Sequence, residues 1–274
     1  MSDLKQYPQA LSIAGSDSGG GAGMQADLKT IQERHVFGAT VLVAITAQNT
    51  IGVQDALPLP ENIIDAQFKS LAADLDVKAC KTGMLADVTR VRAVVRNLKK
   101  YDFGPLTVDP VMVAKGGAPL LSEDAVAVVR DELLPLATLA TPNLPEAEKL
   151  TGLTIDDEAA MKQAGIALQG LGVKNVIIKG GHLSADQESN DFVLLENGES
   201  FWLTSKRVDT IRTHGTGDTL SACITAELAK GVNIADAIRT GKDFVEAAIA
   251  DGIIVGHGHG PLNHWALEAR RHEF

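Results

Sequence analysis

Cysteine is scarce in this chain: its 274 residues include two, Cys80 and Cys223, which lie far apart in apolar stretches. Two distant cysteines define no disulfide framework, so an extracellular domain held together by disulfides is not expected. Long apolar runs are also missing, since no segment approaches the roughly 20 residues that cross a bilayer. Residues 1–9 lack the basic-then-apolar layout of a signal peptide. We therefore expect a cytoplasmic protein without a membrane segment.

Clusters of basic residues are missing too. The 25 Lys and Arg residues are outnumbered by 35 Asp and Glu residues, and the acidic residues are spread along the chain, giving a formal net charge of −10. Nucleic-acid phosphates are bound by clustered Lys and Arg, so we expect no nucleic-acid partner. The P-loop pattern G-x-x-x-x-G-K-[ST] does not occur, which argues against a P-loop nucleotide site.

Short runs of apolar and β-branched residues alternate with longer amphipathic segments. Continuous apolar runs of this kind are typical of parallel strands that are buried on both faces. Strand–helix repetition then predicts an α/β fold, with a mostly parallel central sheet, helices on both faces and a single domain over residues 1–274. The predicted strands are Ala10–Ala14, Thr40–Thr46, Val77–Lys81, Leu106–Asp109, Thr138–Thr141 and Val176–Lys179.

Helical spacing and one turn signal complete the predicted elements. A helix is expected after Pro60, which suits a first-turn position, and two more are expected around residues 126–133 and 220–228. Asn197-Gly198 is a favoured hairpin dipeptide and lies between two apolar runs. We therefore predict two antiparallel strands, residues 192–195 and 201–204, that extend one edge of the sheet.

The first candidate site is the glycine-rich loop that follows the first predicted strand. Its five glycines, within residues 14–23, allow close backbone approach to a ligand and free several N–H groups. Residues 21–26 also satisfy G-x-G-x-x-A, the dinucleotide pattern, but the match begins several residues after the strand. A flexible loop without a ligand is a further alternative. The interpretation that we favour is a small-molecule pocket.

The second candidate site is the segment 213–219, Thr-His-Gly-Thr-Gly-Asp-Thr, which opens a predicted helix. Glycines at a helix start expose unpaired N–H groups at the positive end of the helix dipole, where anions bind. Asp218 could be an ordinary first-turn acid, because Asp is favoured there. The functional alternative is an anion hole for a transferring phosphate, with Asp218 accepting a proton.

Segment 209–219 resembles the C-terminal signature of the ribokinase-like (PfkB) kinases. Segment 12–30 resembles more specifically the N-terminus of the hydroxymethylpyrimidine and hydroxymethylpyrimidine-phosphate kinases, and of a related branch of pyridoxal kinases. Further matching blocks occur in the family's order at residues 46–50, 81–84, 108–112, 141–148, 179–182 and 258–261. The resemblance covers nearly the whole chain, and it implies a ribokinase-like three-layer sandwich.

The resemblance also implies where the pyrimidine binds, between the first glycine loop at Gly15 and the second strand. Asp27 would hold the substrate's hydroxymethyl group, and Gln48 would bind the edge of the aminopyrimidine ring. A primary amide suits that edge because it offers a donor and an acceptor side by side. Met84 would lie against the ring. The structural alternatives are an exposed helix acid for Asp27, a backbone-bonded amide for Gln48 and core filling for Met84.

The resemblance further implies the phosphate and metal sites. Asp109 and Glu146 would help to arrange Mg²⁺, because carboxylate oxygens suit this hard cation, which keeps several waters. For both carboxylates the structural alternative is an ordinary acid in a turn or at a helix start. For Lys179 and Lys242, which are expected near the phosphates, the alternative is an ordinary surface lysine. The residues expected to bind ATP or its phosphates are Asn143, Lys179, Thr213 and Lys242. The residues expected at the catalytic centre are Asp218, Gly215, Thr216 and Gly217.

One residue departs from the family pattern. The pyrimidine kinases and their pyridoxal-kinase relatives usually have cysteine where this chain has Asp218. Cys223 is no substitute, because five residues along a helix turn it roughly 140° away. The histidines at the C-terminal end, His257, His259, His264 and His272, are expected in a solvated tail that packs back on the domain rather than in a metal site. His214 is expected to shape the anion loop.

These observations predict an ATP-dependent kinase that phosphorylates 4-amino-5-hydroxymethyl-2-methylpyrimidine and its monophosphate for thiamine biosynthesis. ATP and Mg²⁺ are the expected cofactors, and a homodimer is implied by the resemblance alone. The alternatives are a pyridoxal or pyridoxine kinase, an enzyme with both activities, and a binding module that has lost turnover. The presence of Asp109, Lys179 and Asp218 argues against the last of these.

Overall fold

A computed structural model describes residues 5–113, 121–181 and 188–267. Within these residues nine strands form one sheet, in the order β3-β2-β1-β4-β5-β6-β7-β8-β9. His182, at the end of the matching block 179–182, and His272 lie outside the described residues. The strands are β1 (Gln9–Gly15), β2 (Phe37–Asn49), β3 (Gly52–Pro58), β4 (Val77–Thr82), β5 (Leu106–Val108), β6 (Leu139–Ala140), β7 (Asn175–Ile178), β8 (Glu188–Leu194) and β9 (Ser200–Lys206).

The centre of the sheet is parallel, from β2 through β1, β4, β5 and β6 to β7. The predicted hairpin is confirmed as β8 and β9, in which Leu194 pairs with Ser200 across the turn. The opposite edge also ends in an antiparallel pair, β2 and β3, which the sequence did not predict. The side chains of β3 are mostly exposed and its sequence has no long apolar run, so it lacks the signal of a buried strand.

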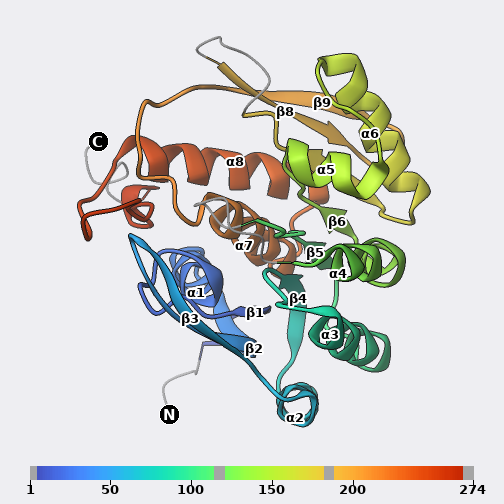
Figure 1. Ribbon diagram of the computed structural model, residues 1–274, viewed down its shortest axis with the longest axis vertical. Helices are drawn as coiled ribbons and strands as arrows, with labels where there is room; N and C mark the ends of the chain where they lie inside the picture. Colours follow the sequence, from blue (N-terminus) through green and yellow to red (C-terminus); the bar gives the residue numbers. More distant parts are fainter. Residues whose placement is uncertain (1–4, 114–120, 182–187, 268–274) are drawn as a thin grey trace.

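Helices cover both faces of the sheet, as predicted (Figure 1). On one face α7 packs between α1 and α8 and contacts β1, β4 and β5. On the other face α2, α3, α4, α5 and α6 follow one another across the sheet. The helices are α1 (Gly23–Glu33), α2 (Glu61–Ala72), α3 (Val88–Lys100), α4 (Glu123–Val128), α5 (Leu144–Thr151), α6 (Glu158–Gly170), α7 (Thr216–Ala229) and α8 (Ile234–Ala250).

Side-chain caps explain several helix starts. The Asp87 carboxylate accepts from the backbone N–H of Arg90 at the start of α3, and Asp157 and Asn233 cap α6 and α8 in the same way. Pro60 is the residue before α2 rather than a first-turn residue, because its ψ of 143° is extended. The apolar spacing predicted around residues 126–133 crosses from α4 into a short π-helix, Val129–Leu133, and then a 3₁₀ turn, Leu134–Leu136.

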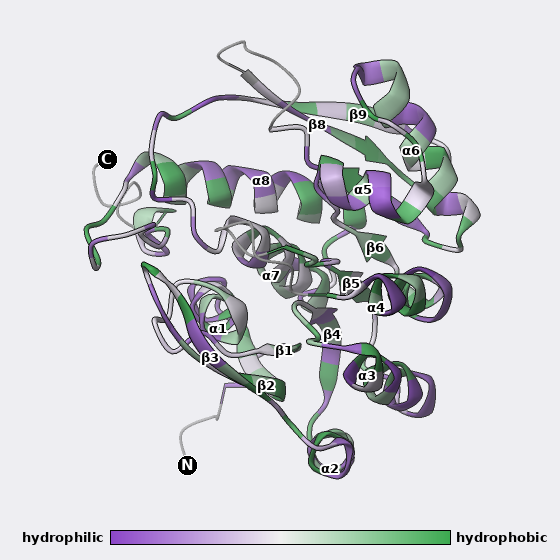
Figure 2. Cartoon of the chain, in the orientation of Figure 1, coloured by the Kyte–Doolittle hydropathy of each residue, from purple (hydrophilic) through white to green (hydrophobic). Residues whose placement is uncertain are grey.

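The largest apolar core lies between the sheet and helices α2–α6, and a second core joins the sheet to α7 and α8. Figure 2 shows hydrophobic and hydrophilic residues alternating along α8, as expected of a helix with one buried face. The C-terminal segment packs back on the domain at residues 260–264, which are buried, whereas His257 and His259 are exposed. His264 is therefore not solvated: it lies 3.1 Å from the Thr219 hydroxyl, and burial lowers its pKa to about 4.

Two loops meet at the carboxyl ends of the parallel strands. Gly215, directly before α7, has a φ of 84°, and a Cβ atom on it would overlap the carbonyl oxygen of Gly21 in the first glycine loop. Gly198, in the β8–β9 turn, has the same φ of 84°, but among the described residues no neighbouring atom lies within 4 Å of the point that a Cβ on it would occupy. The two glycines thus share one backbone conformation and differ in the space around them.

Replacing each of these glycines by alanine should separate the two effects. Gly198→Ala introduces left-handed strain alone, and we expect it to lower the free energy of unfolding by about 1–2 kcal/mol. Gly215→Ala adds an overlap that must push the loops apart, and we expect about 1–3 kcal/mol of further loss. Denaturant unfolding of both variants measures the difference. Equal losses would show that the two loops do not need their close contact.

Candidate active site

The first glycine loop is organised by Asp17, which the sequence reasoning missed. Its carboxylate accepts hydrogen bonds from the backbone N–H groups of Gly19 (2.8 Å), Gly21 (3.0 Å) and Ala22 (2.9 Å). Burial alone would raise the pKa of Asp17, but the His214 side chain and these N–H groups hold that pKa below its ordinary value. An Asp followed by small residues and glycines is the signal of such a turn and could have identified it.

His214 joins the two glycine loops. Its Nε2 atom lies 3.0 Å from the Asp17 carboxylate and 3.2 Å from the Gln48 side-chain nitrogen. The Gln48 backbone is held by Ser18, whose hydroxyl donates to the Gln48 carbonyl and accepts from its N–H, both at 2.7 Å. The amide of Gln48 therefore stands at the end of β2, between the two loops.

Met84 and Gly15 lie together on the other side of the first loop. The Gly15 N–H donates to the Met84 carbonyl at 3.0 Å. The Met84 methyl group lies against the place where a Cβ on Gly15 would be, so a larger residue at position 15 would require this flexible side chain to move. Met84 is half-buried, and its sulfur accepts from the Ala86 N–H at 3.1 Å. Gly15, Gln48 and Met84 are thus brought to the same edge of the sheet.

Asp27 lies in α1 and is buried, so it is not the exposed helix acid that was its structural alternative. Its side chain is fully buried under the first loop, and its oxygens bind the Ser12 hydroxyl at 2.5 Å and the Lys81 ammonium at 2.6 Å. With no exposed surface, this carboxylate offers no direct contact to a ligand in the structure. Burial raises the pKa of Asp27 above its ordinary value, with Asp218 adding to the effect and the Lys81 ammonium opposing it.

Asp218 stands in the first turn of α7, with 15% of its side chain exposed. Its nearest cation is Lys81, 3.7 Å from the carboxylate, and Lys81 itself is fully buried. Helix α7 begins two residues earlier, at Thr216, whose hydroxyl donates to the Thr213 carbonyl at 2.7 Å. Gly215, Thr216, Gly217 and Asp218 therefore present the N-terminal N–H groups of α7 next to a carboxylate.

A second lysine–carboxylate group lies beyond Gly217. Asp109, which follows β5, accepts from the Lys179 ammonium at 3.1 Å and from the Thr141 hydroxyl at 3.2 Å. A Cβ on Gly217 would lie 2.9 Å from Asp109 and 3.3 Å from Lys179, so glycine lets the start of α7 approach both. Although burial disfavours its charged form, Asp109 and Glu146 raise the pKa of Lys179.

Asn143 and Glu146 form the capping box of α5. The Asn143 side chain accepts from the Glu146 N–H, and the Glu146 carboxylate accepts from the Asn143 N–H, both at 2.9 Å. The helix-start alternative for Glu146 is thus present in the structure. Burial, with Asp109 nearby, raises the pKa of Glu146 to about 7.

Lys242 already has an anionic partner. Its ammonium lies 2.7 Å from the Asp191 carboxylate, whose other oxygen accepts from the Gly180 N–H at 2.9 Å. Gly180 follows Lys179 in the chain, so Lys242 is linked to the same loop that carries Lys179. This contact was not predicted, because α8 and β8 are distant in sequence.

The residues described contain no group of three or more His, Cys, Asp or Glu side chains arranged to hold a metal ion. Mg²⁺ does not need such a group, since it is commonly held by one or two carboxylates, waters and substrate phosphates. Asp109 and Glu146 fit that chemistry: both are hard oxygen donors, and both lie close enough to Lys179 to raise its pKa.

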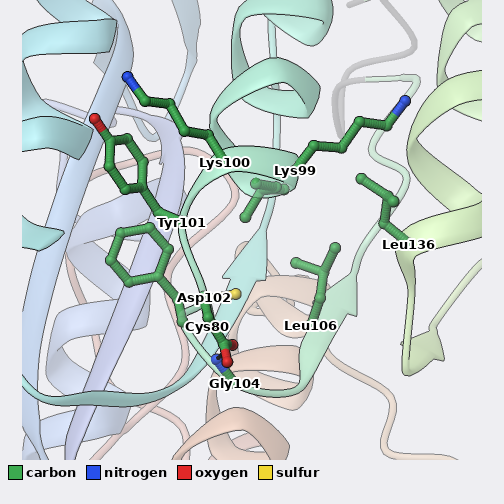
Figure 3. A pocket seen from close by; sticks show the side chains of 10 residues that line it. Cys80, Lys99, Lys100, Tyr101, Asp102, Gly104, Leu106 and Leu136 are labelled. Carbon is green, nitrogen blue, oxygen red and sulfur yellow. Dashed lines mark hydrogen bonds between the residues drawn. The ribbon is translucent and has the colours of Figure 1, made fainter.

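The cysteines and one further hollow lie outside this edge. Burial raises the thiol pKa of both Cys80 and Cys223 to about 12, so neither is a reactive thiolate at neutral pH. Cys80 lines a hollow of about 330 Å³ at the amino end of β5, opposite the candidate site (Figure 3). Lys99 and Lys100 extend from it in different directions, so their charges do not converge.

Among the described helices, none is both long and apolar enough to span a membrane.

Comparison with known proteins agrees with the sequence resemblance. The family model described as phosphomethylpyrimidine kinase matches residues 17–263. A hydroxymethylpyrimidine/phosphomethylpyrimidine kinase of Haemophilus influenzae is 53% identical over 268 residues, covering 97% of this chain and 98% of that protein.

Solved structures support the same fold. The ADP complex of Bacillus subtilis pyridoxal kinase superposes with a TM-score of 0.89 at 38% identity, covering 96% of this chain and 99% of that one. A phosphomethylpyrimidine kinase from Clostridium difficile gives a TM-score of 0.79 at 40% identity, covering 88% and 99%. The predicted ribokinase-like fold and kinase class are confirmed, and the chain belongs to the phosphomethylpyrimidine kinase family.

Proposed function

We propose that this chain transfers phosphate from ATP first to the hydroxyl group of hydroxymethylpyrimidine and then to the phosphate of the resulting phosphomethylpyrimidine. The observation that carries the proposal is the start of α7, where Asp218 lies in the first turn and His214, directly before Gly215, contacts the Gln48 side chain. Membership of the phosphomethylpyrimidine kinase family supports this choice of substrate.

The pyrimidine ring would bind between the two glycine loops. Gln48 would read the ring edge, Met84 would lie against a ring face, and Gly15 would leave room for both. Asp27, being buried, takes a supporting role beneath this pocket rather than direct contact with the hydroxymethyl group. The support for this arrangement is that all three pocket residues lie at the carboxyl ends of β1, β2 and β4.

The phosphates of ATP would bind along the start of α7. The residues that would contact them, directly or through the loop that carries them, are Gly215, Thr216, Gly217, Thr213, Asn143, Lys179 and Lys242. A dipole end and a lysine are suited to the charge of a transferring phosphoryl group. Asp109 and Glu146 would hold Mg²⁺, which when bound offsets negative charge on the phosphates. The binding of ADP by the Bacillus subtilis relative supports use of ATP.

In the reaction the acceptor oxygen attacks the γ-phosphorus of ATP, and the bond from that phosphorus to the β-phosphate oxygen breaks. ADP leaves with the electron pair of that bond. The proton of the acceptor hydroxyl passes to Asp218, whose carboxylate is partly exposed at the mouth of the anion hole. The N–H groups of Gly215–Asp218 hold the transferring oxygens while charge moves across them.

Pyridoxal kinase remains the second candidate, because several of the similar solved structures are pyridoxal kinases. Asp218 does not separate the two candidates, since the resemblance places a thiol at this position in both groups of enzymes. Gln48 weighs against pyridoxal, because an amide matches the donor and acceptor of an aminopyrimidine.

Three further properties are proposed. A single domain over 1–274 is supported by the continuous sheet of the described residues. A homodimer is supported by apolar side chains exposed on the edge hairpin: Phe37, Ile45, Val53 and Leu57. A cytoplasmic location is supported by the two unpaired, buried thiols.

The choice of substrate can be tested by comparing specificity constants. We expect kcat/KM for hydroxymethylpyrimidine to exceed kcat/KM for pyridoxal, and Gln48→Ala to lower the first by about 10- to 100-fold through loss of about 1–3 kcal/mol. The apparent affinity for ATP should stay unchanged, because the amide would contact the ring and, through His214, the loop before α7, but not the nucleotide. A preference for pyridoxal, or equal losses for ring and ATP, would contradict the assignment.

The role of Asp218 can be tested with Asp218→Asn, which keeps the shape and removes the proton acceptor. Turnover should fall by roughly 10²- to 10⁴-fold while ATP still binds. Steady-state kinetics and nucleotide titration measure the two quantities. Near-normal turnover would mean that Asp218 is an ordinary first-turn acid and that another group accepts the proton.

A further inference from the structure

Lys81 is a fully buried cation placed between two carboxylates. Its ammonium lies 2.6 Å from Asp27 and 3.7 Å from Asp218, and the second oxygen of Asp27 accepts from the Ser12 hydroxyl at 2.5 Å. The three charged side chains come from β4, α1 and α7, so this contact joins three elements directly beneath the anion hole. Removing ions from water is costly, and a buried lysine persists where anions surround it.

One ammonium cannot fully neutralise two carboxylates. Although burial disfavours the charged amine, Asp27, Asp218 and Asp109 raise the pKa of Lys81, so this side chain stays a cation at neutral pH. The shorter contact is with Asp27, and Asp218 receives the remaining attraction. A neutral side chain at position 218 would leave Lys81 paired with Asp27 alone. The carboxylate at this position therefore creates a competition that a neutral residue would not.

We propose that Lys81 is a positioning residue that holds the Asp218 carboxylate ready to accept a proton, and that Asp27 competes with Asp218 for the same ammonium. The proposal rests on the assignment of Asp218 as proton acceptor. Lys81 has no exposed surface and acts through Asp218 rather than on the substrate. Because Asp27 is buried beside Lys81, its charge determines how strongly Lys81 attracts Asp218.

Two further charged side chains of the candidate site have their own partners, although Asp109 also adds to the negative charge around Lys81. Asp109, after β5, bonds to Lys179 and Thr141. Lys242, on α8, bonds to Asp191. Lys81 and Asp27 are thus the charged pair whose change should be felt most strongly at Asp218.

The proposal predicts opposite effects from two substitutions in one buried network. Lys81→Met removes the cation and keeps most of the side-chain volume, so ionisation of Asp218 becomes harder. Asp27→Asn removes the competing anion, so Lys81 attracts Asp218 more strongly. The Asn amide can accept from Lys81 with its oxygen and donate to Ser12 with its nitrogen, which preserves both contacts.

The measurement is the pH dependence of kcat/KM for hydroxymethylpyrimidine at saturating ATP. The acidic limb should move up by about one pH unit in Lys81→Met and down by about one pH unit in Asp27→Asn. If Lys81→Met alone fails to fold, the double variant Lys81→Met/Asp27→Asn removes both charges together, and its limb should lie about one pH unit above that of Asp27→Asn, close to its place in the unmutated protein. A limb that stays in place in either single variant or moves in the same direction in both, or a double variant whose limb coincides with that of Asp27→Asn, overturns the proposal.

Arg34→Met is the matched control. Arg34 is a largely buried cation between α1 and α7, with 13% of its side chain exposed and 2.7 Å from Glu227, but it lies at the other end of both helices. It should lower stability without moving the acidic limb, and a shift as large as in Lys81→Met would assign the effect to helix packing. Asp218→Asn tests the proton acceptor separately from the positioning role of Lys81. If the acidic limb disappears in Asp218→Asn but does not shift in Lys81→Met, only the positioning role is rejected. If the limb is unchanged in Asp218→Asn, Asp218 is not the proton acceptor.

Discussion

The N-terminus of α7 lies so close to the first glycine loop that Gly215 has no room for a Cβ atom beside the Gly21 carbonyl. This contact brings together segments that are far apart in the chain: Asp17 and His214, whose side chains meet there, are separated by 197 positions. It also places the N–H groups of α7 at the carboxyl edge of the parallel strands. The pocket, the anion hole and the proton acceptor depend on this one approach of two backbones.

Charge is arranged around that contact in two lysine–carboxylate groups. Lys81 lies beneath Asp218, and Lys179 pairs with Asp109 on the far side of Gly217. Each lysine is held as a cation by buried carboxylates, which raise its pKa. A transferring phosphoryl group would therefore pass between fixed charges that need little rearrangement, which is how electrostatic preorganisation lowers a barrier. Lys179 would face the phosphates, whereas Lys81 would act on the proton acceptor from below.

Much of the fold followed from local patterns. Continuous apolar runs gave the parallel strands, and Asn197-Gly198 gave the β8–β9 hairpin, because both signals reside in a few adjacent residues. Strand β3 could not be predicted in this way, since its side chains are largely exposed and it is held by pairing with β2. The π-helix after α4 was likewise not predicted, because the apolar spacing around residues 126–133 does not distinguish it from an α-helix.

For the candidate site, too, some features could be predicted from local sequence and others could not. Motifs predicted which residues would gather at the carboxyl edge, and the structure brings Gln48, Asp109 and Asp218 there. What a motif could not give was the partner of each side chain. Asp27 is buried and paired with Lys81, and Lys242 is paired with Asp191 through a contact between distant elements. Such pairs depend on three-dimensional distances that no local spacing encodes.

The most direct test of the central claim is to follow phosphorus-31 resonances while the unmutated protein acts on hydroxymethylpyrimidine with excess ATP. The account predicts that a pyrimidine monophosphate forms first and is then converted to the diphosphate, with about two ADP molecules released for each pyrimidine. Release of inorganic phosphate with the pyrimidine unchanged would contradict it. So would a reaction that stops at the monophosphate while pyridoxal is phosphorylated under the same conditions.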